Sequence, residues 1–144
     1  QHFFGETGFG YQFNYTMVEG DIGYNDGSNP DEDQFALPGL SDTLNLVGIY
    51  EKDGLSARLA YNWRDNFLNQ VNRSVGSTRN PEYIASVEQL DLNVSYELES
   101  GVTLSLDAIN LTGEGQRKYG RTDTAAFFVQ ELDPRYVLSA RYTF

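Results

Sequence analysis

The chain has 144 residues, with 21 acidic residues against 10 lysines and arginines, a formal net charge of −11, one histidine and no cysteine. Because a nucleic-acid binder needs clustered lysine and arginine side chains to displace phosphate counterions, this balance excludes nucleic acid as a main partner. The missing cysteines exclude disulfides, thiol nucleophiles and cysteine-bound zinc, and one histidine leaves too few ligands for a histidine-based metal site.

Six segments alternate apolar and polar residues with a period of two, which predicts strands with one apolar and one polar face. In chain order they cover residues 9–17, 44–51, 55–64, 90–99, 102–108 and 136–144. No segment has a convincing helical pattern. The longest strongly apolar run, residues 125–129, is far shorter than the ~20 residues of a membrane-spanning helix.

The connections between these segments alternate between short and long. The short ones contain glycine and predict tight turns at residues 5–8, 51–54 and 99–101. The long ones, residues 19–43, 65–89 and 113–134, are rich in Asn, Gly, Asp, Ser or Pro and predict long loops. Short turns at one end and long loops at the other are typical of an outer-membrane β-barrel.

The apolar faces of the predicted strands carry aromatic residues at both ends and aliphatic residues between them. We predict that the membrane-interface aromatics are Tyr11, Tyr50 and Tyr96 near the short turns, with Tyr61 and Trp63 at the other end. The opposite faces hold charged and amide side chains that a dry core would leave without partners. The pattern therefore predicts an all-β, antiparallel transmembrane barrel with a polar lumen.

The acidic excess is concentrated in the first third of the chain, because residues 1–51 carry nine acidic residues and neither lysine nor arginine. Asn29, Asp31 and Asp33 alternate like the ligands of a calcium loop. However, Gln34 stands where that loop needs glycine, and Leu40 where it needs the closing glutamate. We therefore predict a solvated acidic loop, no metal site and no cofactor.

Several stretches, in order and spacing, carry a resemblance that covers essentially the whole chain. They are residues 37–42 (LPGLSD), 50–52 (YEK), 56–65 (SARLAYNWRD), 110–112 (NLT), 116–121 (QRKYGR) and 135–144 (RYVLSARYTF). Together they resemble the C-terminal end of a TonB-dependent outer-membrane receptor, of the branch common in Caulobacter- and Xanthomonas-like bacteria.

The resemblance implies a 22-stranded barrel that is closed by a plug domain and imports scarce nutrients with energy passed on by TonB. Residues 1–144 would be the C-terminal portion of the barrel domain, its last six strands, without the plug and the earlier strands. Six strands would leave two unpaired edges in hydrocarbon, so we expect a fragment of a longer polypeptide.

The implied partners are the rest of the barrel and its plug, the TonB complex, the barrel-assembly machinery, and the lipid and lipopolysaccharide of a Gram-negative outer membrane. The resemblance also makes the C-terminal strand the signal read by the assembly machinery. Its residues are Tyr136, Leu138, Ala140, Tyr142 and Phe144.

Two long loops hold the candidate ligand-binding residues, which could stack on a sugar or pair with an anion. They are Arg117, Lys118, Tyr119, Arg121, Phe127 and Phe128 in one loop, and Asn72 and Arg73 in the other. Packing among neighbouring loops is the alternative role. In the branch that the chain resembles, carbohydrate uptake is common. The resemblance therefore favours an oligosaccharide over an iron–siderophore complex as the transported ligand.

Three further hypotheses concern enzyme activity and two other folds. His2 has no nucleophile motif near it, so we expect no enzyme. A small eight-stranded barrel with a structural or adhesive role is one alternative to the receptor, although only six strands are evident. A soluble carbohydrate-binding β-sandwich is the other.

Overall fold

The computed structural model describes residues 1–19, 23–25, 27, 34–75 and 78–143, with the side chains of residues 72–79 excepted. These residues form eleven antiparallel strands in two sheets and one short 3₁₀ helix, η1 (Gly5–Thr7). The described part of the chain contains no helix that is long and apolar enough to cross a membrane.

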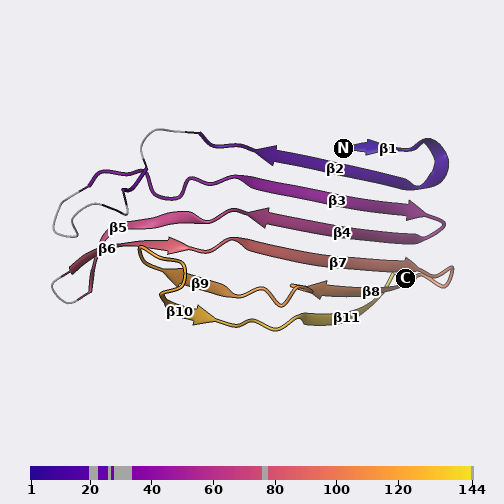
Figure 1. The fold of residues 1–144 in the computed structure, drawn as a ribbon. Helices are drawn as coiled ribbons and strands as arrows, with labels where there is room; N and C mark the ends of the chain where they lie inside the picture. The colour runs from indigo at the N-terminus through magenta and orange to yellow at the C-terminus, as the bar shows by residue number, and fades with distance from the viewer. Residues whose placement is uncertain (20–22, 26, 28–33, 76–77, 144) are drawn as a thin grey trace.

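The larger sheet has seven strands in the order β1-β2-β3-β4-β7-β8-β11, and the smaller has four in the order β10-β9-β6-β5 (Figure 1). The larger sheet comprises β1 (His2–Phe3), β2 (Phe9–Thr16), β3 (Thr43–Lys52), β4 (Leu55–Arg64), β7 (Val87–Glu97), β8 (Val102–Ile109) and β11 (Arg135–Tyr142). The smaller comprises β5 (Phe67–Val75), β6 (Thr78–Ile84), β9 (Gln116–Tyr119) and β10 (Ala126–Gln130).

All six strands expected from the alternating pattern are present, as β2, β3, β4, β7, β8 and β11, with ends within three residues of the expected ones. The prediction of long loops at residues 65–89 and 113–134 was wrong, because these segments contain the whole four-stranded sheet. Register shifts interrupt the β5–β6 and β9–β10 pairs and break the period-two pattern. Pro81 lies at one such shift, where a strand tolerates a residue without an N–H.

The four-stranded sheet continues four strands of the larger one. Arg64 pairs with Val87 at the end of β4–β7, and Phe67 pairs with Ile84 at the start of β5–β6, so the register is unchanged across the gap. Residues 55–75 therefore run as one arm of a single long hairpin, about 70 Å at ~3.4 Å per residue. Figure 1 shows the smaller sheet at the end of the larger one opposite the short turns.

Three glycines fix the strands to one another at the short-turn end. Each has a positive φ, between +79° and +84°, and a Cβ there would lie 2.7–2.9 Å from the carbonyl oxygen of a residue at or next to the end of the neighbouring strand. The same three residues donate backbone hydrogen bonds to the glycine carbonyls. The bonds join Glu51 N to Gly8 O (2.8 Å), Glu97 N to Gly54 O (2.9 Å) and Thr143 N to Gly101 O (3.0 Å).

The register places most of the apolar residues of the larger sheet on one face. One row across six strands consists of Tyr11, Gly48, Leu59, Leu92, Ala108 and Tyr136. Most of this face is open; Leu138, for example, is 81% exposed. The accessible surface is 9769 Å², against about 7,500 Å² expected for a compact monomer of 16.2 kDa. The described strands form a single layer, with small buried clusters around Val47 and Ala60 and around Leu68 and Ile84.

The larger sheet is open among the described residues. One edge is formed by β1 and β2 and the other by β11, and these edges do not pair with each other. The described strands therefore form an all-β, antiparallel wall and not a closed barrel.

Candidate ligand-binding surface

A partly buried ion pair lies at the centre of the four-stranded sheet. Lys118 of β9 places its Nζ 3.1 Å from Glu82 Oε1 of β6, and the two side chains are 25% and 8% exposed. Asn69 of β5 donates a second hydrogen bond of 2.6 Å to the same oxygen. The ammonium also lies 5.6 Å from the ring centre of Phe128. The charge of Lys118, a predicted ligand contact, is thus already engaged within the sheet.

Two stacked tyrosines lie on the other face of the same strands. Tyr83 and Tyr119 pair in register, with ring centres 5.3 Å apart and planes 17° from parallel. Arg117 is 5.9 Å from the Tyr119 ring and donates a hydrogen bond to the backbone oxygen of Asp123. Because side chains alternate along β9, Arg117 and Tyr119 lie on one face and Lys118 on the other. The predicted cluster is therefore divided between two faces.

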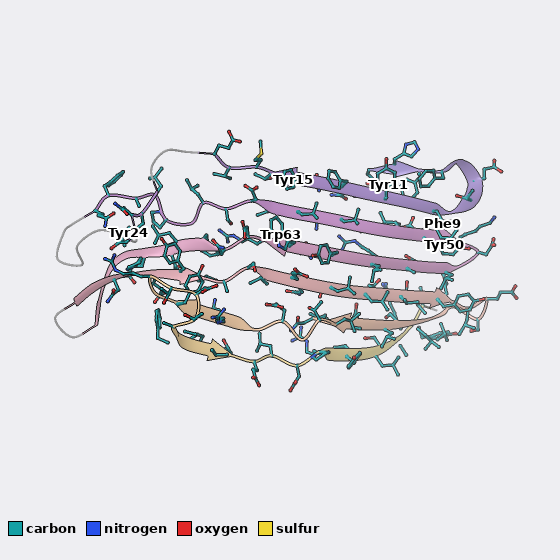
Figure 2. The ribbon with its side chains drawn as sticks, in the orientation of Figure 1. Phe9, Tyr11, Tyr15, Tyr24, Tyr50 and Trp63 are labelled. Carbon is teal, nitrogen blue, oxygen red and sulfur yellow. The ribbon has the colours of Figure 1, made fainter. Side chains whose placement is uncertain are left out.

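Arg121 joins the segment that follows β9 to the N-terminal third of the chain. Its guanidinium donates to Asn80 Oδ1 (3.4 Å) and to the hydroxyl of Tyr24 (3.3 Å), and lies 5.7 Å from the Tyr24 ring. Figure 2 shows Tyr24 at the end of the molecule that holds the four-stranded sheet, far from the short turns. Tyr24, which no sequence pattern marked as a binding residue, therefore lies beside the four-stranded sheet.

A cavity of about 480 Å³ opens where these elements meet. Its walls are mainly aromatic and aliphatic, with two polar side chains. They comprise Tyr24, Phe67, Tyr83, Val18, Leu37, Leu40 and Leu68, with Glu19, Asn66 and Gly23. This size and mixture are typical of pockets that stack against a ligand and orient it with few polar contacts.

Arg64 holds one wall of this cavity in place. Its guanidinium donates to Ser41 Oγ (2.8 Å) and to the carbonyl oxygen of Gly39 (2.7 Å), and lies 3.7 Å from the centre of the Phe67 ring. Gly39 in turn donates its N–H to Leu68 O at 2.7 Å, against the edge of β5. The chain that precedes β3 is therefore pinned beside the four-stranded sheet.

The other predicted ligand-binding residues lie either on an edge strand or outside the described residues. Phe127 and Phe128 lie on β10, at the edge of the four-stranded sheet, and are 42% and 41% exposed. The side chains of Asn72 and Arg73 lie outside the described residues, as do Asn29, Asp31 and Asp33 of the acidic segment. Within the described ranges, no group of three or more acidic, histidine or cysteine side chains could hold a metal ion.

The five residues predicted to be membrane-interface aromatics all belong to strands of the larger sheet. Tyr11, Tyr50, Tyr61, Trp63 and Tyr96 share the apolar face by register. Figure 2 shows Phe9 and Tyr50 near the short turns and Trp63 and Tyr15 further toward the other end. The proposed assembly-signal residues Tyr136, Leu138, Ala140 and Tyr142 alternate along β11 on this face, and Phe144 lies outside the described residues.

Residues Glu82, Tyr24, Phe67 and Tyr83 are important to this surface, yet sequence reasoning missed them. Tyr83 and Glu82 follow Pro81 in a polar stretch, which indicated a loop. In the sequence, these residues stand out only by their aromatic rings or charge. Neither property predicts which segments of the chain come together at the cavity.

Comparison with known proteins adds no relative, because the chain matches no family model, no curated protein and no solved structure.

Proposed function

We propose that this chain is one wall of a TonB-dependent nutrient receptor in the outer membrane of a Gram-negative bacterium. Its six long strands would be the last strands of a 22-stranded barrel, with the plug domain and the remaining strands as partners. The observation that carries this proposal is the apolar face, which is continuous in register across six strands and largely exposed.

Lipid is the cover that best suits this face. Its middle is aliphatic, with Leu46, Leu59, Leu104 and Leu106 each 38–45% exposed, and tyrosines lie toward both ends. An exposed apolar area this large on a water-soluble monomer would promote aggregation. Against hydrocarbon it is favourable, and tyrosine and tryptophan suit the two interfaces with water.

The other face supports a polar lumen. Asn93 of β7 donates to Asp107 of β8 at 2.6 Å, and amide side chains form a row across β2, β3, β4 and β7. In this arrangement the polar face contacts the plug domain, water and passing solute. The four-stranded sheet and its cavity then project from the membrane and meet the ligand first.

The open sheet favours this receptor over the two alternatives. A small eight-stranded barrel needs its edges to pair, and a sandwich needs a second layer over the apolar face. The described strands have unpaired edges, and the smaller sheet continues the larger one end to end.

Fluorescence of Trp63, the one tryptophan of the chain, tests the orientation of the faces. The intact polypeptide is reconstituted into vesicles with Trp63 as its only tryptophan, and brominated lipids are used as quenchers. We expect strong quenching by bromine on the acyl chains near the interface and weak quenching by aqueous acrylamide.

A matched variant moves the reporter to the other face. In Trp63→Phe/Asn62→Trp the indole would face the lumen, so acrylamide should quench it and brominated lipid should not. Equal quenching of both reporters by lipid, or recovery of the polypeptide in the soluble fraction without detergent, would reject the membrane assignment.

A further inference from the structure

The cavity of about 480 Å³ beside the four-stranded sheet has mostly apolar walls. Two leucines of its lining, Leu37 and Leu40, are 46% and 50% exposed. Since apolar surface gains stability when it is removed from water, a ligand that covers these side chains with apolar groups gains affinity. A dry apolar cavity of ~150 Å³ holds one benzene molecule, so this space suffices for a compound of one or two aromatic rings.

Two arginines lie beside the cavity, and each contacts a ring of its lining. The Arg64 guanidinium is 3.7 Å from the centre of the Phe67 ring and donates two hydrogen bonds to the segment before β3. The Arg121 guanidinium is 5.7 Å from the Tyr24 ring and donates to the Tyr24 hydroxyl at 3.3 Å. Neither arginine belongs to the lining. Their positive charges are therefore directed at the protein.

The charge of the cavity disfavours an anionic ligand. Glu19 is the one charged side chain among the described residues that line it. Residues 1–51, which supply half of the lining, carry nine acidic residues and neither lysine nor arginine. An anion would lose hydration here and meet a carboxylate, whereas a cation would gain a partner.

The lining also disfavours a ligand with many hydroxyl groups. Half of its residues have side chains without any hydrogen-bonding group. They are Val18, Leu37, Leu40, Phe67 and Leu68. Hydroxyl groups placed against such walls lose hydration without gaining a hydrogen bond. An aromatic ring loses little hydration there, and it can pack against Phe67, Tyr24 and Tyr83 in stacked or edge-to-face arrangements.

We propose that this cavity binds an aromatic compound of one or two rings that is neutral or cationic, and that Glu19 pairs with the cationic group of the charged members. The inference rests on the proposed function, because it names the ligand class for the part of the receptor that projects from the membrane. The Trp63 experiment contains no ligand, so the membrane assignment and the aromatic site can each fail without the other.

Three compounds with the same ring system and different charges test the site. At neutral pH tryptamine is a cation, indole is neutral and indole-3-acetate is an anion. Calorimetry on the intact polypeptide in lipid nanodiscs, with empty nanodiscs as the blank, measures their affinities. We expect tryptamine to bind at least as tightly as indole, and indole-3-acetate to bind about tenfold more weakly than tryptamine.

Two variants separate the apolar wall from the carboxylate. Leu40→Asp places a charge in the wall and should weaken the binding of indole about tenfold. Glu19→Gln should remove most of the difference between tryptamine and indole-3-acetate, and it should change indole binding less than about twofold. Leu132→Asp is the matched control, because Leu132 is 47% exposed but lies outside the cavity. It should leave all three affinities within about twofold of the wild type.

Several results would overturn the aromatic site. They are no binding of indole or tryptamine to the wild type, tighter binding of indole-3-acetate than of tryptamine, and equal losses in Leu40→Asp and Leu132→Asp. Maltohexaose that binds more tightly than indole, and that Leu40→Asp weakens, would assign the cavity to a saccharide. Unchanged electrophoretic mobility of the folded variants establishes that a loss of binding is not a loss of folding.

Discussion

Lys118 and Glu82 form an ion pair of 3.1 Å between β9 and β6, and Asn69 bonds the same carboxylate oxygen from β5. Three strands of the smaller sheet are thereby joined by their side chains. Glu82 is only 8% exposed, so polar partners such as these offset the cost of burying its charge.

Lys118→Met should destabilise the four-stranded sheet, by up to about 3–5 kcal/mol, because it removes a charged partner from a buried carboxylate. Hydrogen exchange of the β6 and β9 amides measures the effect as lost protection. In Glu82→Leu/Lys118→Met both charges are gone, and we expect most of the protection to return. Arg117→Met, on the opposite face, is the control, and an equal loss in it would contradict a role for the buried pair.

Substitution by arginine should separate the two faces of β8. Leu106→Arg puts a charge on the apolar face and should cost about 2–4 kcal/mol if the residue lies near the bilayer midplane. Ser105→Arg, one residue away, points to the other face and should cost less than about 1 kcal/mol. Urea titration of folding in lipid vesicles provides both values. Similar costs for the two variants would show that the faces do not differ in their surroundings.

Gly54→Ala should destabilise the short-turn end of the larger sheet. Its φ of +79° and the Glu97 carbonyl oxygen, 2.9 Å from a Cβ, both disfavour alanine. The left-handed conformation alone costs about 1–2 kcal/mol. Gly48→Ala is the control, because a Cβ there has no neighbour within 4 Å. Thermal unfolding in detergent should show a lower midpoint for Gly54→Ala only, and equal midpoints would contradict the close approach of the two turns.

Gly115→Ala should loosen the pairing of β9 with β10, because a Cβ at Gly115 would overlap the backbone oxygen of Gln130. Overpacking of this kind costs about 1–3 kcal/mol. Gly120→Ala is the control, since its nearest neighbour is the Pro81 oxygen at 3.9 Å. Hydrogen exchange at β10 measures the difference, and equal protection in the two variants would contradict the tight contact.

The sequence predicted the strands of the larger sheet well because each of them has two different environments. The alternation from Leu55 to Arg64 or from Leu90 to Glu97 records an apolar side and a polar side, and this signal is local. Glycine at 54 and 101 likewise predicted turns, because a positive φ is a property of single residues.

The four-stranded sheet was not predictable in the same way. In β5 and β6 the pairing shifts between Leu68 and Gln70 and again before Arg73. A period of two in the sequence therefore cannot predict which side chains of these strands share a face of the sheet. Only two aromatic residues of the cavity, Tyr83 and Phe67, lie on these strands, whereas Tyr24 comes from a segment far away in sequence.

The sequence by itself thus determined which residues face the same side of each strand, since side chains alternate along any extended backbone. Only the tertiary structure decided which strands are neighbours. Register between strands brings Asn14, Asn45 and Asn62 into one row and Glu82 against Lys118. Such contacts join residues that are tens of positions apart in the sequence. No local sequence pattern predicts which of these residues pair, because the pairing depends on how distant strands align.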